Sequence, residues 1–325
     1  MTTRRTIATA VALVMVLAAC AAETSPTTTE GVAAPATTTT TVAPTTTAAP
    51  TTTTTTVPET TTTTTTIPTP EEIPPVAPEG YELVWSDEFD GDEINLDNWT
   101  HEIGGWGWGN GEAQYYTDDP KNSRVQNGML VIELHQEQIG NNYYTSARMV
   151  TQGKQEFQYG YLETRLKVPA GAGTWPAFWM LGADFGRPEE NPDATPWPFS
   201  GEIDIMEYVG QKPQVVLGTV HGPGYSGAAG LSKWFPQDFA IADDWHTYAI
   251  EWDETGISFF FDDQFYYKVT PEMVGDNREY VFDKPYFFII NLAFGGTLGG
   301  NIALDLEYPI QYYADYVRVY QRVDA

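Results

Sequence analysis

The stretch Glu202-Ile203-Asp204-Ile205-Met206-Glu207, called the acidic motif below, predicts one β-strand that carries three carboxylates. Side chains alternate between the two faces of a regular strand, so Glu202 and Asp204 share a face while Glu207 is out of phase by one residue. A β-bulge, which inserts one extra residue, would return Glu207 to that face and leave both isoleucines facing the core. The motif therefore predicts a bulged strand with three acids along one wall.

Three carboxyl groups held this close cannot all ionise freely. We expect one to have a raised pKa and to stay protonated near neutral pH while another stays anionic, which supplies an acid and a nucleophile. A solvated acidic edge strand is the alternative interpretation, because the chain contains 44 Asp and Glu in 325 residues. The rest of the sequence has to decide between the two.

The C-terminal half consists of short aromatic and β-branched runs separated by turn residues. Strands are expected at 247–253, 257–261 and 264–269, with a central strand at 286–291. A strand at 316–320 is expected to close an outer sheet beside the early strand 82–85. No long helical period interrupts these runs, so the predicted fold is all-β, a sandwich or barrel. No internal repeat is apparent, which argues against a propeller or solenoid.

The N-terminus predicts export. Arg4 and Arg5 precede an apolar run at 7–17 that is too short to span a bilayer, so 1–19 is expected to be a signal peptide. The run ends in Leu17-Ala18-Ala19-Cys20, which resembles a bacterial lipoprotein signal with Cys20 as the lipidated residue. The protein is then expected at the cell envelope, anchored through Cys20, or outside the cell. An ordinary signal peptide with an incidental cysteine is the alternative.

Threonine, proline and alanine dominate residues 20–78, which predicts a disordered linker ahead of a single domain at 79–325. Cys20 is the only cysteine, so an intrachain disulfide is excluded. The net charge of -28 argues against nucleic acid and anionic lipid as partners and favours a neutral substrate. We expect a monomer that meets a membrane only through a lipid anchor.

Residues 81–321 resemble the laminarinase-like endo-β-1,3-glucanases of glycoside hydrolase family 16. The resemblance is carried by the acidic motif and by ordered segments on both sides of it: WSDEF at 85–89, GWGNGEAQYY at 107–116, TSAR at 145–148, WPAFWML at 175–181, HGP at 221–223, WHTYAIEW at 245–252 and NLAFGG at 291–296. It implies a β-jelly roll, a sandwich of two antiparallel sheets with a substrate cleft on the concave face. It also implies hydrolysis of internal β-1,3-glucosidic bonds without a catalytic cofactor.

The resemblance assigns Glu202 as the nucleophile and Glu207 as the general acid/base. Retaining glycosidases place two such carboxyl groups about 5 to 5.5 Å apart, a separation that one bulged strand can hold. Asp204 is expected to hydrogen-bond Glu202 and to help set the two pKa values. Mixed-linkage β-1,3-1,4-glucan and agar-type galactan remain alternative substrates, and a non-catalytic glucan-binding module is disfavoured because both glutamates are present.

Sugars bind through hydrogen bonds and through stacking of their C–H faces on aromatic rings, so the cleft should combine aromatic and polar side chains. Core packing remains an alternative for the tryptophans of 175–181, a structural role for the histidine, and a surface or structural role for the arginine. The substrate-binding candidates are Trp106, Trp108, Asn110, Glu112, Gln114, Arg148, Trp175, Trp179, His221, Asn291 and Phe294.

A structural calcium ion is a further expectation from the resemblance. Many laminarinase-like relatives carry one on the convex face, and the matching positions here are Glu88, the Gly128 carbonyl and Asp315. Oxygen donors suit calcium, but acidic turns are also ordinary solvated surface. No metal is expected in the catalytic step.

Overall fold

The computed structural model describes residues 67–323, so the predicted signal peptide, Cys20 and the linker as far as residue 66 lie outside the described residues. Strands dominate the described part, with only two short α-helices, α1 (Pro271–Val274) and α2 (Gly296–Gly299), and two 3-10 turns at Gly227–Ala229 and Ile241–Asp243. None of its helices has the length and apolar character needed to cross a membrane. The all-β prediction is confirmed.

The first large sheet is antiparallel and has the order β16-β15-β14-β9-β18-β5-β4, with β1 also paired to β18. The long β18 makes this possible because its first half pairs with β5 and its second half with β1. The strands are β1 (Tyr81–Asp87), β4 (Ser123–Val125), β5 (Leu130–Leu134), β9 (Gly160–Lys167), β14 (His246–Asp253), β15 (Gly256–Phe261), β16 (Gln264–Val269) and β18 (Ile310–Arg322).

The second large sheet is also antiparallel and has the order β13-β12-β11-β10-β17-β7-β2, with β8 paired to β17. A separate parallel pair joins β3 to β6. The strands are β2 (Thr100–His101), β3 (Gln114–Tyr116), β6 (Tyr144–Ser146), β7 (Arg148–Val150), β8 (Glu156–Phe157), β10 (Thr174–Gly182), β11 (Glu202–Glu207), β12 (Val215–His221), β13 (Leu231–Pro236) and β17 (Tyr286–Phe294).

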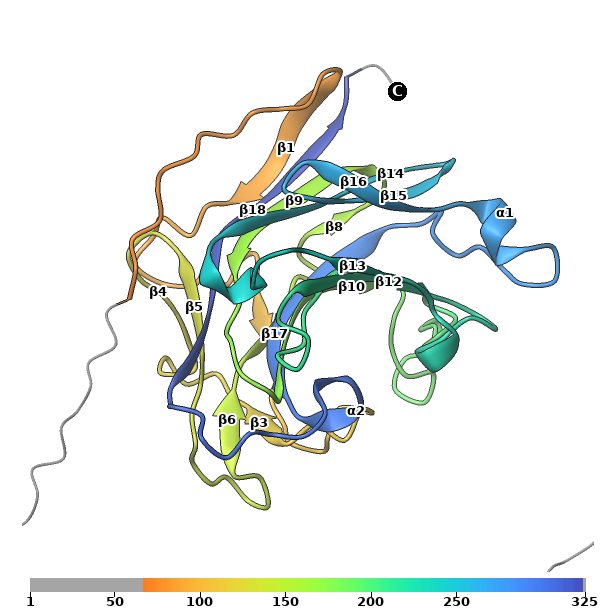
Figure 1. Cartoon of the computed structure of the whole chain (residues 1–325). Coiled ribbons are helices and arrows are strands. Elements are labelled where there is room, and N and C mark those ends of the chain that lie inside the picture. The colour runs from red at the N-terminus through yellow and green to blue at the C-terminus, as the bar shows by residue number, and fades with distance from the viewer. Residues whose placement is uncertain (1–66, 324–325) are drawn as a thin grey trace, which may run out of the picture. The chain divides into compact units, whose positions relative to one another are not determined.

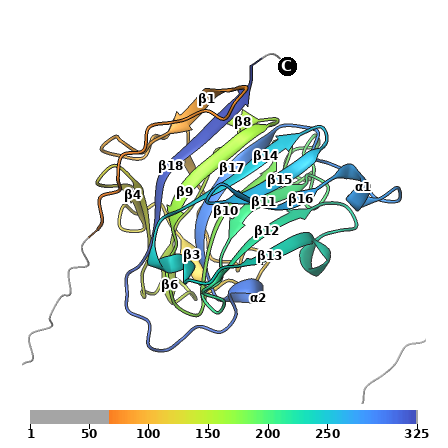
Figure 2. The same cartoon turned by 45° about the horizontal axis from the view of Figure 1, so that its top comes forward.

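The two sheets form layers, with β14, β15 and β16 lying over β10, β12 and β13 (Figure 1). The main core fills the space between them and includes Phe178 and Phe288 from the second sheet and Leu162 and Val317 from the first. Figure 2 shows β18, β9, β14 and β15 running alongside one another across the first layer. Both layers curve in the same sense, and the second sheet lies on the inner, concave side of the bend (Figure 1).

The predicted strands of the C-terminal half are confirmed. The runs at 247–253, 257–261 and 264–269 are β14, β15 and β16, and the run at 286–291 lies in the fully buried β17. The run at 316–320 lies in β18 and pairs with β1 as expected, which places Tyr320 opposite Leu83, and β18 is a central strand of its sheet because its other edge pairs with β9.

The predicted linker boundary at residue 78 is wrong for residues 67–78, which lie against the domain. Ile67 packs against a small apolar cluster that contains Met129 and Val131, and Arg318 donates a hydrogen bond to the carbonyl of Ile73. Proline-rich chain does not need a hydrogen-bonded ladder to lie on a surface, because a few apolar anchors and carbonyl acceptors are enough. Residues 67–78 therefore lie along the domain instead of belonging to a free linker.

Candidate active site

The acidic motif forms β11 and contains the predicted bulge. Asp204 lies opposite Thr219 of β12, whereas Glu207 lies opposite Leu217, so three steps along β11 match two along β12. The extra residue turns Glu207 back to the face of the other acids. The side chains between them are buried in the core between the sheets: Ile203, Ile205 and Met206.

The acids form a tight cluster with His221, which lies opposite Glu202 at the end of β12. His221 Nε2 is 3.3 Å from Asp204 Oδ2 and 3.6 Å from Glu202 Oε1. Within residues 67–323, this is the only place where three His, Cys, Asp or Glu side chains each bring one potential metal-ligand atom within 4.8 Å of the other two. Two carboxylates and an imidazole also suit a divalent metal ion, so this trio is where such an ion would find ligands.

Burial raises the pKa of all three carboxyl groups. The negative charges of Asp204 and Glu207 raise the pKa of Glu202 further, and the charge of Glu207 does the same for Asp204. No lysine or arginine within residues 67–323 forms an ion pair with any of the three. The cluster therefore retains protons at pH values where exposed carboxyl groups are ionised, as an acid catalyst requires.

Trp175 and Trp179 both project from β10 to the face that carries the acids, as predicted. Trp175 Nε1 donates a 3.0 Å hydrogen bond to Glu207 Oε1, and its ring is largely buried against Val209 and Ala293. This bond favours the ionised form of Glu207 and so opposes the effect of burial on its pKa. Trp175 thus orients the acid, while the more accessible Trp179 offers ring surface to a ligand.

A chain of hydrogen bonds holds Trp179 in place. Trp179 Nε1 donates to Asn291 Oδ1 at 2.7 Å, Asn291 Nδ2 donates to Tyr116 Oη at 3.1 Å, and Tyr116 Oη donates to Glu112 Oε2 at 3.1 Å. Burial raises the pKa of Glu112, although Asn110 and Gln114 also donate to its carboxylate. We call the chain Trp179, Asn291, Tyr116 and Glu112 the Glu112 relay.

Arg148 lies between two of the predicted cleft tryptophans. Its guanidinium carbon is 4.7 Å from the ring centroid of Trp108 and 4.8 Å from that of Trp179, and the group pairs with Glu102. The ring of Trp106 lies 4.1 Å from that of Trp108 and is 62% exposed. Stacked aromatic and guanidinium planes form a rigid wall of the kind that binds sugar rings.

A family model described as glycosyl hydrolases family 16 matches residues 110–316. The chain belongs to glycoside hydrolase family 16. A second model, described as beta-glucan synthesis-associated protein SKN1/KRE6/Sbg1, matches residues 1–204 and stops before Glu207. The protein is therefore a glycoside hydrolase, and its two-sheet fold is the jelly roll of this family.

Similar proteins agree with this assignment. A beta-glucanase of Rhodothermus marinus is 44% identical over 252 residues, covering 75% of this chain and 86% of that protein. A glucan endo-1,3-beta-glucosidase of Cryptopygus antarcticus is 39% identical over 238 residues, covering 69% and 84%. The crystal structure of the laminarinase catalytic domain from Thermotoga maritima superposes with a TM-score of 0.70 at 42% identity, covering 76% of this chain and all of that one.

Two predicted substrate contacts of the family 16 domain are wrong. Phe294 has no exposed surface and packs between the rings of Tyr144 and Tyr308 in the main core. It lies three positions after Asn291 on β17, so strand alternation directs these two side chains to opposite faces. Gln114 is also fully buried, and it donates to Glu112 and accepts from the backbone N–H of Phe294, so it links strands instead of binding sugar.

Sequence reasoning missed Trp197, which stands in the loop before the acidic strand. Its indole lowers the pKa of the Glu202 carboxyl group against the effect of burial. The ring is 43% exposed, and its centroid lies 6.2 Å from that of His221. The sequence does place Trp197 between two prolines in a polar loop. A tryptophan in such a loop is not expected to pack in the core, and this could have indicated a ligand-binding or catalytic role.

The expected calcium ligands fit an ion only in part. Arg318 binds both carboxylate oxygens of Glu88, at 3.0 and 2.7 Å, and Arg165 binds Asp315 Oδ2 at 2.9 Å. The oxygens left for an ion are therefore Asp315 Oδ1 and the main-chain carbonyls of Glu88 and Gly128. Carbonyl and carboxylate oxygens together are a donor set that calcium accepts.

Proposed function

We propose that this protein hydrolyses internal β-1,3-glucosidic bonds of laminarin-type β-glucan with retention of anomeric configuration. The observation that carries the proposal is the bulge in β11, which turns Glu202 and Glu207 to the same open face of the sheet. The printed names of the relatives, a glucan endo-1,3-beta-glucosidase and a laminarinase among them, support this choice of glucan.

In the first step a carboxylate oxygen of Glu202 forms a bond to the anomeric carbon while the bond from that carbon to the glycosidic oxygen breaks. Glu207 gives its proton to the departing oxygen, so the leaving chain departs as a neutral alcohol. In the second step Glu207 takes a proton from water. The water oxygen then bonds to the anomeric carbon, and Glu202 leaves as a carboxylate.

The mutual repulsion of the acids drives the change of role at Glu207. Glu202 and Glu207 repel each other when both are ionised, so the negative charge of one raises the pKa of the other. Esterification removes the charge of Glu202, which lowers the pKa of Glu207 and makes it a base for the second step. We further propose that Asp204 hydrogen-bonds Glu202 and holds the nucleophile in place for attack.

Product analysis tests the proposal. The purified domain is incubated with laminarin, lichenan, agarose and carrageenan, and the linkage of each product is identified. We expect oligosaccharides from laminarin, released first as the β-anomer in NMR spectra recorded at early times. Products from lichenan or agarose alone would assign one of the alternative substrates, and laminarin binding without products would indicate a binding module.

We also propose one structural calcium ion, held by Asp315 and by the carbonyls of Glu88 and Gly128. Removing it should lower the melting temperature and leave the catalytic groups intact, because β11 lies in the other sheet. The measurement is a melting curve with and without a chelator, followed by calcium addition. An unchanged curve in a sample shown by elemental analysis to contain calcium beforehand would contradict the proposal.

Export and lipid attachment through Cys20 complete the proposal, and they rest on sequence pattern. A full-length chain should fractionate with membranes and incorporate labelled palmitate, whereas Cys20→Ser should do neither. We further propose that the catalytic domain is a monomer, which light scattering on the purified domain measures directly.

A further inference from the structure

An exposed tryptophan stands on the same face as the catalytic acids, two strands away. Trp234 of β13 lies opposite Leu217 of β12, and Leu217 lies opposite Glu207. Side chains directly opposite one another in a sheet share a face, and neighbouring strands lie about 4.8 Å apart, so Trp234 begins roughly 10 Å from the acid. The next residue, Phe235, confirms the alternation because it turns into the core and stacks on Tyr266.

The ring of Trp234 is partly covered by a cation instead of by apolar packing. Lys212, an exposed residue ahead of β12, places its Nζ 3.6 Å from the ring centroid. Trp234 remains 37% exposed, while Leu217 beside it is nearly buried. A tryptophan is highly buried in most proteins, so a ring held open beside a catalytic cluster indicates a ligand contact.

Trp234 lies on the opposite side of β11 from the aromatic residues already described. Trp179 and Trp108 approach the acids from the side of β10 and β7, whereas β13 is the other edge of the sheet. Trp234 is also in the same cross-strand row as Glu207, while Glu202 shares its row with His221. Because Glu207 protonates the departing oxygen, this row lies on the leaving-group side of the broken bond.

We propose that Trp234 and Lys212 form a sugar-binding platform for the leaving-group portion of the polymer. One ring face stacks on the C–H face of a glucose unit, and the lysine ammonium both holds the ring and donates hydrogen bonds to sugar hydroxyl groups. The inference rests on the proposed function, since it needs a chain that extends beyond the cleaved bond. The enzyme would then bind the polymer on both sides of the catalytic strand, which suits cleavage at internal positions.

The experiment compares two substrates that differ only on the leaving-group side. Laminarin places glucose units there, whereas an aryl β-laminaribioside places only a flat aryl group. Trp234→Ala should lower kcat/KM for laminarin by about 3- to 10-fold, the range expected for one lost stacking contact, and should leave hydrolysis of the aryl glycoside unchanged. Trp234→Phe should lie in between, and Lys212→Met should lower laminarin hydrolysis by a smaller factor.

Phe265→Ala is the matched control, because Phe265 is a 54% exposed aromatic residue on β16, an edge strand of the other sheet. It should behave like the wild type on both substrates. An equal loss on both substrates in Trp234→Ala, or no loss on laminarin, would overturn the platform while the proposed function stands. A wild-type protein that leaves laminarin intact would instead overturn the proposed function, and the platform with it.

Discussion

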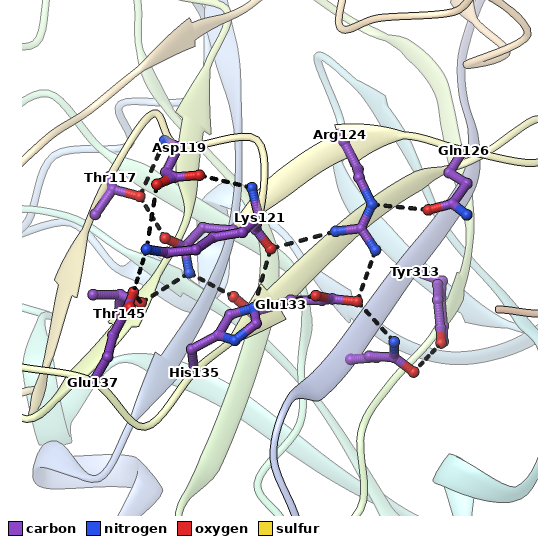
Figure 3. A network of polar contacts seen from close by, with 12 residues as sticks. Thr117, Asp119, Lys121, Arg124, Gln126, Glu133, His135, Glu137, Thr145 and Tyr313 are labelled. Atoms are coloured by element: carbon purple, nitrogen blue, oxygen red, sulfur yellow. Dashed lines mark hydrogen bonds and ion pairs between the residues drawn. The ribbon is translucent and has the colours of Figure 1, made fainter. Parts of the chain in front are cut away.

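Two regions of this molecule bury carboxyl groups with opposite results. Glu133, which is buried on β5, lies in the polar network drawn in Figure 3, and hydrogen bonds from His135, Arg124 and Gln311 outweigh its burial and hold its pKa at about 2. In the acidic motif of β11 burial is not offset in this way, and the carboxyl pKa values are raised. The same type of group is thus a fixed anion in one sheet and a proton donor in the other.

The supply of cations explains the difference. Around Glu133 the chain places an arginine at 2.8 Å and a histidine at 3.1 Å, and Lys121 joins Asp119 to Glu137 in the same network (Figure 3). Beside the catalytic acids no lysine or arginine of residues 67–323 forms an ion pair with one of their carboxylates, and Arg148 is instead paired with Glu102 and stacked between tryptophans. The structure therefore outweighs the burial of Glu133 with cationic and hydrogen-bonding partners, whereas His221 and the two indoles offset the burial of the catalytic acids only in part.

Loss of the nucleophile should give the largest effect. Glu202→Ala should lower kcat by about 10⁴-fold or more, as loss of a residue that acts as part of a catalytic unit does. Added azide should occupy the space left by the Glu202 side chain and attack the anomeric carbon from the side where Glu202 stood. The product from an activated aryl β-glycoside is then an α-glycosyl azide. The measurements are turnover, product NMR and a melting curve to confirm folding. Full activity in this variant would falsify the assignment of Glu202.

The two indole donors should move opposite limbs of the pH profile. Trp197→Phe removes the indole N–H that lowers the pKa of Glu202, so the acid limb of kcat/KM should move to higher pH. Trp175→Phe removes the bond that lowers the pKa of Glu207, so the alkaline limb should move to higher pH. Each variant should shift one limb by up to about one unit, the usual reach of a single hydrogen bond. If both limbs moved together in either variant, the separate roles of the two acids would be contradicted.

Disrupting the polar network around Glu133 should lower the free energy of unfolding and leave catalytic activity unchanged. Glu133→Gln removes the anion that Arg124 and His135 share and should cost about 2–4 kcal/mol of unfolding free energy. In the wild type the contribution of Glu133 should be lost as pH falls from about 4.5 to about 2, because its folded pKa is the lower one. The contribution of His135, whose pKa the bond to Glu133 raises, should be lost as pH rises past that raised value. Urea unfolding across pH at unchanged kcat/KM checks both signs.

The Glu112 relay should give the smallest effect. Tyr116→Phe removes the acceptor of Asn291 and one donor to Glu112, so Trp179 should lose part of its fixed orientation. We expect KM for laminarin to rise about 2- to 5-fold with a smaller change in kcat, in line with about 1 kcal/mol for one hydrogen bond.

Tyr312→Phe is the control for the relay. Tyr312 is equally buried, and its Oη has no hydrogen-bond partner within the described residues. It should match the wild type in both parameters. A KM for Tyr116→Phe that equals that of this control would show that the relay does not position the cleft.

The bulge and the two catalytic positions were predictable because they depend on neighbouring residues. Alternation in β11 places two acids on one face, and only one inserted residue can bring Glu207 to them while keeping the isoleucines inside. The same rule would have excluded Phe294, since Asn291 and Phe294 differ by an odd number of positions. Phe294 was wrongly predicted as a substrate contact because the family resemblance was given more weight than the two-residue alternation of the strand.

Other features needed contacts between distant parts of the chain. His221 was predicted near the acids, but not that a Cβ at Gly230 would lie 2.4 Å from its ring, so that glycine there leaves room for the imidazole. The open ring of Trp234 depends on the pairing of β13 with β12, and its cation comes from a different loop. Nothing in the local pattern of either segment indicates these contacts.

The sequence by itself determined which acids point the same way, because side-chain direction along a strand is a local property with a period of two residues. Only the tertiary structure decided how those acids titrate and which aromatic rings stay open. The pKa of a carboxyl group depends on the burial and charges that surround it, and here these come from other strands, such as His221 of β12 and Trp175 of β10, which reach the acids only when the sheet has formed.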